Sequence, residues 1–393
     1  MTRLAVPEND PFGLHNLPYG VYSVGDGPRR VAARLGDHVI DLATLLKDPI
    51  FEQPTLNPFM AQGRERWAQA RNRITQALQQ DVPDPAIRSL DTVTLHLPFE
   101  VADYVDFYAS EHHAANLGRL FRPDNPDPLM PNWKHLPVGY HGRSSSIVVS
   151  GSNIVRPAGQ RKAPDQTTPV FGPSTRLDIE AELGFVVGTG NPMGKPIDVE
   201  HAEDHLFGVV VFNDWSARDI QAWEYVPLGP NLGKSFASTI SPWVVPMQAL
   251  QDAKVDVPIQ EPAVLPYLSM TSPWGLDIDL EVCWNGQVVS RPPYAEMYWS
   301  PAQMLAHLTV NGAPTRTGDL FASGTISGPG KDQRGAFIEL TWGGSEPVTI
   351  NGEERTFLQD GDVITLRAIA TGPGGRPVGF GEATGRIVPN SGS

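Results

Sequence analysis

Hydrophobic residues in the second half of the chain recur at every second position or in short unbroken runs, a pattern that predicts β-strands. Residues 178–187 alternate in this way, with the apolar side chains on one face. Residues 206–212 are apolar throughout, which is typical of a strand buried on both faces. The same patterns predict strands at 318–327, 336–342, 362–371 and 378–388. The chain is therefore predicted to have a mainly β fold of the α+β kind.

Two Asn-Gly pairs mark sharp turns between strand-like runs. Asn285-Gly286 lies inside the segment 277–290, and Asn351-Gly352 lies between positions 348 and 357. Asparagine and glycine tolerate the positive φ angles that a two-residue hairpin loop needs. We therefore expect two β-hairpins in this part of the chain.

Helical spacing of apolar residues is limited to a few segments. Within residues 63–80, the apolar side chains of Trp67, Ala70, Ile74 and Leu78 recur at helical spacing. Shorter helices are predicted at 38–46, 106–120, 216–225 and 300–308. The last of them has a serine at the N-cap position and a proline in its first turn, both of which favour a helix start.

The first 80 residues read as a separate unit. Residues 19–24 and 31–35 are predicted strands, and they precede the predicted helices of this region. Residues 81–98 contain three prolines and read as a linker. A chain of 393 residues is long enough for two or three domains. We expect an N-terminal domain over 1–98, which includes the linker, and a catalytic domain over 99–393.

Composition and charge exclude several classes of protein. The 38 glycines and 38 prolines favour turns and short strands over long helices. A net charge of −14 argues against binding to nucleic acid or to anionic lipid, because both would repel the chain. Cys283 is the single cysteine, which rules out an intrachain disulfide or a multi-thiolate zinc site. With no apolar run of membrane-spanning length and no secretory signal pattern, we expect a cytoplasmic protein.

Three acidic residues stand where a metal could bind. Glu180 and Glu182 are two positions apart in a predicted strand, so their side chains point to the same face. Two adjacent carboxylates suit a hard divalent cation such as Mg²⁺ or Ca²⁺, although a solvated strand face would show the same pattern. Asp214 follows a buried run, where it is either a site residue or a helix N-cap.

Two predicted helices carry polar residues on one face. In the helix 216–225, the side chains of Arg218, Gln221 and Tyr225 share a face, which is either functional or simply exposed. In the helix 106–120, Asp106 and His113 are two turns apart and share a face, as a metal ligand and a proton acceptor would. A single histidine is also common as a structural residue, and the adjacent His112 points elsewhere.

Two common catalytic motifs are absent from the sequence. The glycine-rich segment 324–335 has no Gly-Lys-Ser/Thr ending, which argues against nucleotide binding. No Gly-x-Ser-x-Gly sequence indicates a serine hydrolase, and the serines at 144–146 read as a polar loop.

Longer stretches give the chain a recognisable signature. They are DFYASEHHA from Asp106, PNWKHLPVGYHGRSSSIVVSG from Pro131, NDWSARDIQAWEYVPLGPNLGKSFASTISPWVVP from Asn213, SGTISGP from Ser323 and FIELTW from Phe337. Over essentially its whole length the chain resembles the fumarylacetoacetate hydrolase family. The resemblance implies a small N-terminal SH3-like barrel followed by a large β-roll domain of sandwich type with a few short helices. It also implies a homodimer.

The resemblance further implies an activity and a set of roles. The reaction would be metal-dependent hydrolysis of the carbon–carbon bond of 4-fumarylacetoacetate to fumarate and acetoacetate, the last step of tyrosine and phenylalanine catabolism. The cofactor would be Ca²⁺, Mg²⁺ or both. The implied metal ligands are Asp106, Glu180, Glu182 and Asp214. The implied catalytic residues are the base His113, its partner Glu339, and Arg218, Gln221 and Lys234, which would hold developing negative charge.

The remaining implied residues contact the substrate or a second ion. The substrate-binding residues would be Tyr108, Arg122, Tyr140, Tyr225 and Thr325. A structural Mg²⁺ contact would involve Lys234 and Ser238, where the family carries threonine in place of Ser238. Four carboxylates around one divalent cation leave excess negative charge, so a dianionic diketo acid needs nearby cations. Arg122, Arg218 and Lys234 would supply them.

Two other functions fit parts of the sequence. A hydratase or decarboxylase of another oxo-acid would need only the four carboxylates and a base. It does not account for the long N-terminal unit or for His113 together with Glu339. A binding module stabilised by a cation would keep the carboxylates, but it has no use for Arg218, Gln221 and Tyr225 on one helix face.

Overall fold

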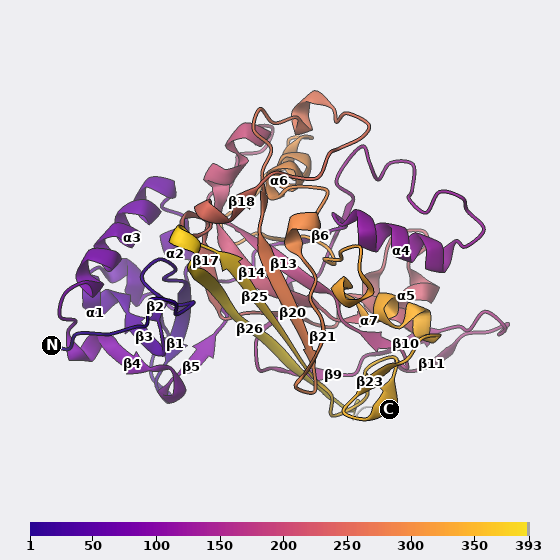
Figure 1. The fold of residues 1–393 in the computed structure, drawn as a ribbon, viewed down its shortest axis with the longest axis horizontal. Helices are drawn as coiled ribbons and strands as arrows, with labels where there is room; N and C mark the ends of the chain where they lie inside the picture. Colours follow the sequence, from indigo (N-terminus) through magenta and orange to yellow (C-terminus); the bar gives the residue numbers. More distant parts are fainter. Residues whose placement is uncertain (391–393) are drawn as a thin grey trace.

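The computed structural model describes residues 1–390. It is a mainly β molecule with short helices, built around a 13-stranded sheet and a five-stranded sheet. In Figure 1 the N-terminal strands and helices lie at one end, and the long strands of both sheets cross in the middle. No helix in this part of the chain combines the length and the apolar character needed to cross a membrane.

The N-terminal strands form one end of the large sheet. They pair in the order β4-β3-β2-β1, and β5 pairs with β1. Within the described residues no hydrogen bonds join β4 to β5, so these strands do not close into a complete barrel. Their bounds are β1 (Tyr19–Ser23), β2 (Arg30–Leu35), β3 (His38–Asp41), β4 (Ile87–Ser89) and β5 (Thr94–His96).

Two predictions for this region need correction. Residues 38–46 are not a single helix, because β3 occupies the first four positions and α1 (Leu42–Leu46) begins only after Asp41 caps it through Thr44 N. Residues 81–98 are more than a linker, because β4 and β5 lie within them. The prolines of this segment lie before β4 and after β5, so they do not interrupt either strand. The division at residue 98 stays a prediction, and β1 also pairs with β17 (Trp243–Pro246) of the later chain.

The helix predicted at 63–80 is confirmed as α3 (Arg64–Leu78). It packs beside α2 (Asn57–Met60) and α1 over the N-terminal strands (Figure 1). Its four apolar residues at helical spacing are all buried. The ring of Trp67 contacts Phe207 edge-on at 5.3 Å between centroids, which ties this helix to the central part of the large sheet.

The centre of the large sheet is the antiparallel pair β13 (Ala181–Val187) and β14 (Leu206–Asp214). Every residue of both strands is buried, as predicted for 206–212. β22 (Leu320–Ala322) pairs with β13, and β6 (Tyr104–Phe107) runs parallel to β22. β22 is much shorter than the strand predicted at 318–327. The other strands of this sheet are β7 (Gly139–His141), β8 (Ile147–Val149) and β16 (Ser238–Ile240).

The five-stranded sheet packs against this centre with its long strands β25 and β26 (Figure 1). Asn285 and Gly286 have φ angles of 51° and 82°, which confirms the first hairpin. The second Asn-Gly pair joins β23 (Val348–Ile350) to β24 (Glu353–Arg355). The strands of the sheet are β21 (Gln287–Ser290), β20 (Ile278–Trp284), β25 (Val363–Thr371), β26 (Pro377–Val388) and β9 (Asn153–Val155). Small two-stranded pairs are β10 (Ala158–Arg161) with β11 (Val170–Pro173), β12 (Leu177–Asp178) with β15 (Ser216–Ala217), and β18 (Lys254–Val255) with β19 (Gly275–Leu276).

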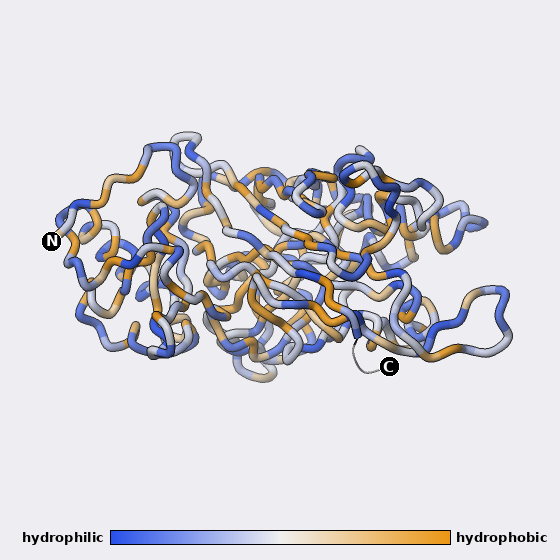
Figure 2. Tube along the Cα trace, turned by 90° about the horizontal axis from the view of Figure 1, so that it is seen from below, coloured by the Kyte–Doolittle hydropathy of each residue, from blue (hydrophilic) through white to orange (hydrophobic). Residues whose placement is uncertain are grey.

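Four helices cover the later part of the chain: α4 (Glu111–Phe121), α5 (Arg218–Glu224), α6 (Pro301–Thr309) and α7 (Phe337–Leu340). The capped start predicted for α6 is confirmed, with Ser300 and Gln303 forming a capping box. Seen from below, hydrophobic stretches occur along the whole body of the trace, whereas the loops that project at the end opposite the N-terminus are mostly hydrophilic (Figure 2).

Two element predictions near the site are wrong. Residues 106–120 are not one helix, because Asp106 belongs to β6 and pairs with Ala322, and the helix begins only after Ser110 caps it through His113 N. The segment 336–342, predicted as a strand, contains the helical turn α7 instead. A distant carboxylate, Asp178, accepts hydrogen bonds from its first two amides, and this tertiary contact overrides the local alternation.

Candidate active site

Four buried carboxylates converge at one end of the central strands of the large sheet. Asp106 comes from β6, Glu182 from β13 and Asp214 from the end of β14, while Glu180 lies just before β13. One ligand oxygen of each lies within 4.8 Å of the others. The two-residue spacing of Glu180 and Glu182 therefore does bring both side chains to one place. Asp106 reaches the cluster from the strand β6, and not from a helix.

Two cations partly neutralise this cluster. Lys234 Nζ forms ion pairs with Glu180 and with Asp214, the latter at 2.7 Å. Arg218 Nη1 lies 2.8 Å from Glu180 Oε1. Burial opposes the charge of Glu180, but Lys234 and Arg218 outweigh it and lower the pKa of this carboxyl. Burial likewise opposes the charge of Lys234, but Asp214 and Glu180 raise the pKa of its ammonium above the ordinary value.

On the other side of the cluster, no cationic side chain of the described residues forms an ion pair with Asp106 or Glu182, and the weaker effect of Lys234 does not offset burial. Burial, and then the neighbouring Asp214, raise the pKa of Asp106 well above its usual range. Burial and the charge of Asp106 do the same to the pKa of Glu182. Asp106 Oδ1 and Glu182 Oε1 are buried without a hydrogen-bond partner in the residues that the structure describes. Buried carboxylate oxygens without donors are costly unless a cation binds them.

The donor set therefore fits a hard divalent cation. All four candidate ligands are carboxylates, which suit Mg²⁺, Ca²⁺ or Mn²⁺ and not a thiophilic metal. Two cationic side chains face these four carboxylates, and Arg218 also pairs with the buried Asp178, so excess negative charge remains for a divalent ion to neutralise.

A histidine–glutamate pair lies beside the cluster. His113 Nδ1 and Glu339 Oε2 are 2.6 Å apart, and both side chains are buried. Asn116 Nδ2 donates to Glu339 Oε1 at 2.9 Å, and Ser327 Oγ donates to Oε2 at 2.9 Å. Burial opposes the charge of Glu339, but His113 and these two donors lower the pKa of its carboxyl. This arrangement leaves Nε2 as the ring nitrogen available for proton transfer.

The structure separates the two adjacent histidines. His113 is 1% exposed and pairs with Glu339, whereas His112 is 35% exposed and lies 3.5 Å from Glu296. Burial raises the pKa of Glu180, whereas Lys234, Arg218 and then His113 lower it, so the histidine is near the carboxylate cluster.

The polar face predicted on α5 is only partly assembled. Arg218 Nη1 donates to Gln221 Oε1 at 3.2 Å. Tyr225 follows the helix and is 52% exposed, away from the buried cluster. Arg218 also has a buried Nη2 without a partner in residues 1–390, which leaves one guanidinium nitrogen for a ligand.

The other residues named from the sequence surround the cluster. Tyr140 donates to Asp214 Oδ2 at 3.2 Å, and Ser238 Oγ donates to Asp214 Oδ1 at 2.9 Å. The ring of Tyr108 meets His113 edge-on at 5.2 Å. Thr325 Oγ1 is buried without a partner within the described chain.

Arg122 is held at the end of α4. Its Nη2 donates to Pro128 O at 3.0 Å, and its Nε has no partner in the described part of the chain. A cavity of about 290 Å³ borders the cluster at Tyr140 and Lys234. Arg143 also lines this cavity, so a cation stands at its rim.

The chain matches two family models over almost its whole length. Residues 15–98 match the model described as fumarylacetoacetase N-terminal, and residues 103–388 match the model described as fumarylacetoacetate hydrolase C-terminal. The chain belongs to the fumarylacetoacetate hydrolase family. Among curated relatives in this family, the human fumarylacetoacetase is 46% identical over 418 residues, which cover 99% of both chains. The Arabidopsis thaliana fumarylacetoacetase is 44% identical over 98% of this chain and 97% of its own.

Solved structures share the family's fold at low identity. A fumarylacetoacetate hydrolase from Exiguobacterium antarcticum is 20% identical, with a TM-score of 0.58 over 95% of this chain and all of its own. A maleylpyruvate hydrolase from Sphingobium, solved with a manganese(II) ion and pyruvate, is 15% identical, with a TM-score of 0.55 over the same shares.

Sequence reasoning missed three residues that support the family's site. Asn116 and Ser327 hold Glu339, and Asp178 holds both Arg218 and α7. Asn116 had a detectable signal, because it lies three positions after His113 on the same helix. Ser327 and Asp178 carried none, because their partners are distant in sequence.

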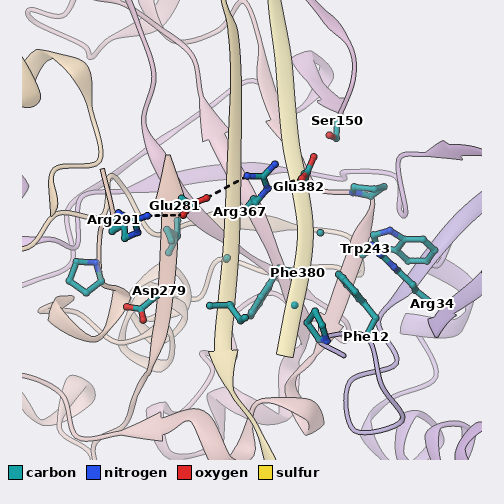
Figure 3. A pocket seen from close by; sticks show the side chains of 18 of the residues that line it. Phe12, Arg34, Ser150, Trp243, Asp279, Glu281, Arg291, Arg367, Phe380 and Glu382 are labelled. Carbon is teal, nitrogen blue, oxygen red and sulfur yellow. Dashed lines mark hydrogen bonds and ion pairs between the residues drawn. The ribbon is translucent and has the colours of Figure 1, made fainter. Parts of the chain in front are cut away.

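A larger cavity than the one beside the cluster lies elsewhere. It has a volume of about 1030 Å³ and borders β20, β25 and β26, and none of the candidate site residues lines it. Four of the charged side chains that line it form a chain of ion pairs (Figure 3). Glu281 lies 3.3 Å from Arg291 and 3.4 Å from Arg367, which in turn lies 2.7 Å from Glu382. These paired charges specify no reaction, and the carboxylate cluster is the candidate active site.

Proposed function

We propose that this enzyme hydrolyses the carbon–carbon bond of 4-fumarylacetoacetate and releases fumarate and acetoacetate, as the last step of tyrosine and phenylalanine catabolism. The observation that carries the proposal is the buried pair of His113 and Glu339 beside the four carboxylates. Curated relatives that are 44–46% identical over nearly the whole chain are named fumarylacetoacetases, which supports the same substrate here.

His113 is the proposed general base. Its Nδ1 faces Glu339, so Nε2 takes the proton from the water that attacks the ketone carbon. Glu339 fixes the tautomer and stabilises the imidazolium that forms. General-base assistance of this kind contributes about 10²–10⁴ in rate. When the carbon–carbon bond breaks, its electron pair stays with the acetoacetate fragment, and the proton on His113 can return to that carbon.

Arg218, Gln221 and Lys234 are proposed to stabilise the negative charge that develops on the substrate. The unpartnered Nη2 of Arg218 supports this role, because it is a fixed donor in a buried site. A preorganised donor aimed at a developing oxyanion lowers the activation barrier by about 3 kcal/mol. The amide of Gln221 is held beside Arg218 by their mutual hydrogen bond.

The metal is proposed to be Ca²⁺ or Mg²⁺, held by Asp106, Glu180, Glu182 and Asp214. When bound, such an ion acts as a Lewis acid on ketone and enolate oxygens. The unpartnered oxygens of Asp106 and Glu182 support this ligand set. A second, structural Mg²⁺ would lie near Lys234 and Ser238. There the carbonyl of Lys234 and the hydroxyl of Ser238 are the groups that can ligate, since an ammonium cannot.

The substrate is proposed to contact Tyr108, Arg122, Tyr140, Tyr225 and Thr325. The free Nε of Arg122 and the free hydroxyl of Thr325 are buried donors that suit a dianion. Since Tyr225 is half exposed, it would contact substrate at the mouth of the site. We also propose that the enzyme is a cytoplasmic homodimer of two domains divided near residue 98.

The direct test is to incubate the metal-loaded protein with fumarylacetoacetate and follow its diketone absorbance and the two products. We expect equal amounts of fumarate and acetoacetate, and loss of the activity with a chelator. His113→Ala and Glu339→Gln should lower kcat at least 10²-fold and leave the thermal unfolding curve cooperative. Absence of products from the metal-loaded protein would overturn the proposal. Decarboxylation and hydration of other oxo-acids would then be screened.

A further inference from the structure

Asp178 is a fully buried carboxylate outside the metal cluster. It ends β12, two positions before Glu180, and its side chain is 0% exposed. A buried carboxylate is stable only where its oxygens are paired and hydrogen-bonded. Its partners therefore indicate what it holds in place.

Both of its oxygens accept two hydrogen bonds each, from two other parts of the chain and from the next residue. Oδ1 accepts from Ile179 N and from Phe337 N, each at 2.7 Å. Oδ2 accepts from Arg218 Nε at 2.8 Å and from Ile338 N at 3.0 Å. One carboxylate thus joins α5 to the start of α7.

The helix α7 has no cap of its own. Its N-cap residue is Ala336, which has no side chain that can accept a hydrogen bond. The first amides of a helix need an acceptor, and a carboxylate there is also favoured by the helix dipole. Asp178 provides it from a segment 159 residues away along the chain. The next residue of this single turn is Glu339.

The same carboxylate orients Arg218. With Nε held by Asp178, Nη1 lies 2.8 Å from Glu180 and Nη2 remains without a partner within residues 1–390. Since a guanidinium is planar, fixing Nε sets the direction of the other two nitrogens.

We propose that Asp178 is a positioning residue that fixes the placement of Glu339 relative to Arg218 in the site. Its role in turnover rests on the proposed function, whereas its role in the geometry of Glu339 does not. An amide at this position would present one oxygen and one NH₂ group to three donors from α5 and α7. At least one donor would then face another donor, and the site would loosen.

The test compares Asp178→Asn with a matched control, Asp362→Asn. Asp362 is also a buried aspartate that pairs with an arginine, Arg355, and accepts a backbone hydrogen bond, from Gln359 N at 2.7 Å. It lies at the start of β25 and contacts none of the candidate site residues. Both variants should lose thermal stability, so that stability alone does not distinguish them.

The two variants should differ in kinetics. We expect Asp178→Asn to lower kcat at least 10²-fold with KM changed less than threefold, because it removes stabilisation made mainly in the transition state. Asp362→Asn should keep kcat within twofold. A kcat for Asp178→Asn within threefold of wild type, or an equal loss in both variants, would overturn the proposal.

A spectroscopic measurement separates this inference from the choice of substrate. The short His113–Glu339 hydrogen bond should give a downfield proton resonance, which His113→Ala would identify. Asp178→Asn should shift or abolish this resonance and Asp362→Asn should not. An unchanged resonance in Asp178→Asn would overturn the proposal even if fumarylacetoacetate is not the substrate.

A second variant keeps the test decisive if Asp178→Asn does not fold. Ala336 has extended backbone angles, φ −133° and ψ 148°, that suit a helix N-cap. Adding Ala336→Ser gives α7 a cap of its own. The Asp178→Asn/Ala336→Ser chain should regain the resonance and only part of kcat, because Arg218 stays unsupported. Full recovery of kcat would refute the role assigned to Arg218.

Discussion

The backbone amide of Gly324 donates a hydrogen bond to Glu182 Oε2 at 3.1 Å. Gly324 has a φ angle of +76°, and a Cβ atom there would lie 2.3 Å from Phe107 O, one residue beyond Asp106. The turn after β22 therefore needs glycine for its positive φ angle and for its close approach to β6, the strand that carries Asp106. The amide of the same residue binds a second carboxylate of the metal cluster.

We expect Gly324→Ala to lower both activity and stability. The Cβ clash would push β22 away from β6 and remove the amide from Glu182. We expect at least a tenfold loss in kcat and a loss of about 2–3 kcal/mol in the free energy of unfolding. Gly352→Ala is the matched control, since Gly352 has a φ of +90° and open space around it. It should cost about 1 kcal/mol and leave kcat unchanged. Equal kinetic loss in both variants would contradict this account.

Ser327→Ala and Asn116→Leu each remove one donor to Glu339. Hydrogen bonds to a charged acceptor contribute about 1.5–3 kcal/mol, and without them Glu339 is less firmly aligned with His113. We expect each variant to lower kcat about tenfold, with a smaller change in KM, in steady-state assays. Ser152→Ala is a suitable control, because its hydroxyl donates to Val149 O outside the site. The prediction fails if both donors can be removed without a loss of kcat.

Removal of the metal should destabilise the folded protein at neutral pH. Asp106 and Glu182 would keep their unpartnered oxygens, whereas a bound ion stabilises the folded state by about 2.7 kcal/mol at a hundred times its Kd. Thermal unfolding should shift down with a chelator and recover with Mg²⁺ or Ca²⁺. Asp106→Asn should abolish the recovery, while Glu382→Gln, a carboxylate outside the cluster, should keep it. A Tm that does not respond to any divalent ion would disprove the metal site.

The N-terminal strands should lose stability in acid through Asp41. Burial opposes its charge, but Arg30 at 2.6 Å and the amide of Thr44 outweigh burial and lower the pKa of this carboxyl. Its contribution to stability is therefore present above the unfolded-state pKa of about 3.9 and is lost as the pH falls through the lower folded pKa. Unfolding measured between about pH 6 and 2 should show a shallower acid limb in Asp41→Asn. Parallel pH curves would contradict the prediction.

Much of the fold follows from patterns that depend on short-range physics. β14 is continuous and buried because its sequence is apolar throughout, and the Asn-Gly turns specify their hairpins through positive φ. The strand prediction for 336–342 is wrong because it rests on local alternation, whereas the contact that stabilises a helical turn there comes from the distant Asp178. Pattern reasoning weighs neighbours in sequence and has no access to such a partner.

The sequence pattern predicts the candidate site, but partly for a wrong structural reason. Helical spacing predicts Asp106 and His113 on one face of a single helix, but Asp106 lies in β6 and His113 lies in the capped helix α4. The metal-ligand role of Asp106 and the base role of His113 follow from the family resemblance, and the helical spacing is incidental. Glu180 and Glu182 do converge, although Glu180 lies just before β13 and not within the continuous strand that the alternation predicts.

The site joins the ends of a long chain segment. β6 pairs in parallel with β22, and His113 meets Glu339 across 226 residues. On the ribosome, Asp106 and His113 therefore emerge long before the partners that complete their surroundings, and a nascent chain shorter than about residue 340 has no assembled centre. A chain whose synthesis stops before β22 would leave β6 without its parallel partner and His113 without Glu339. Such a chain would have no catalytic activity. Activity thus requires synthesis of the chain at least as far as Glu339.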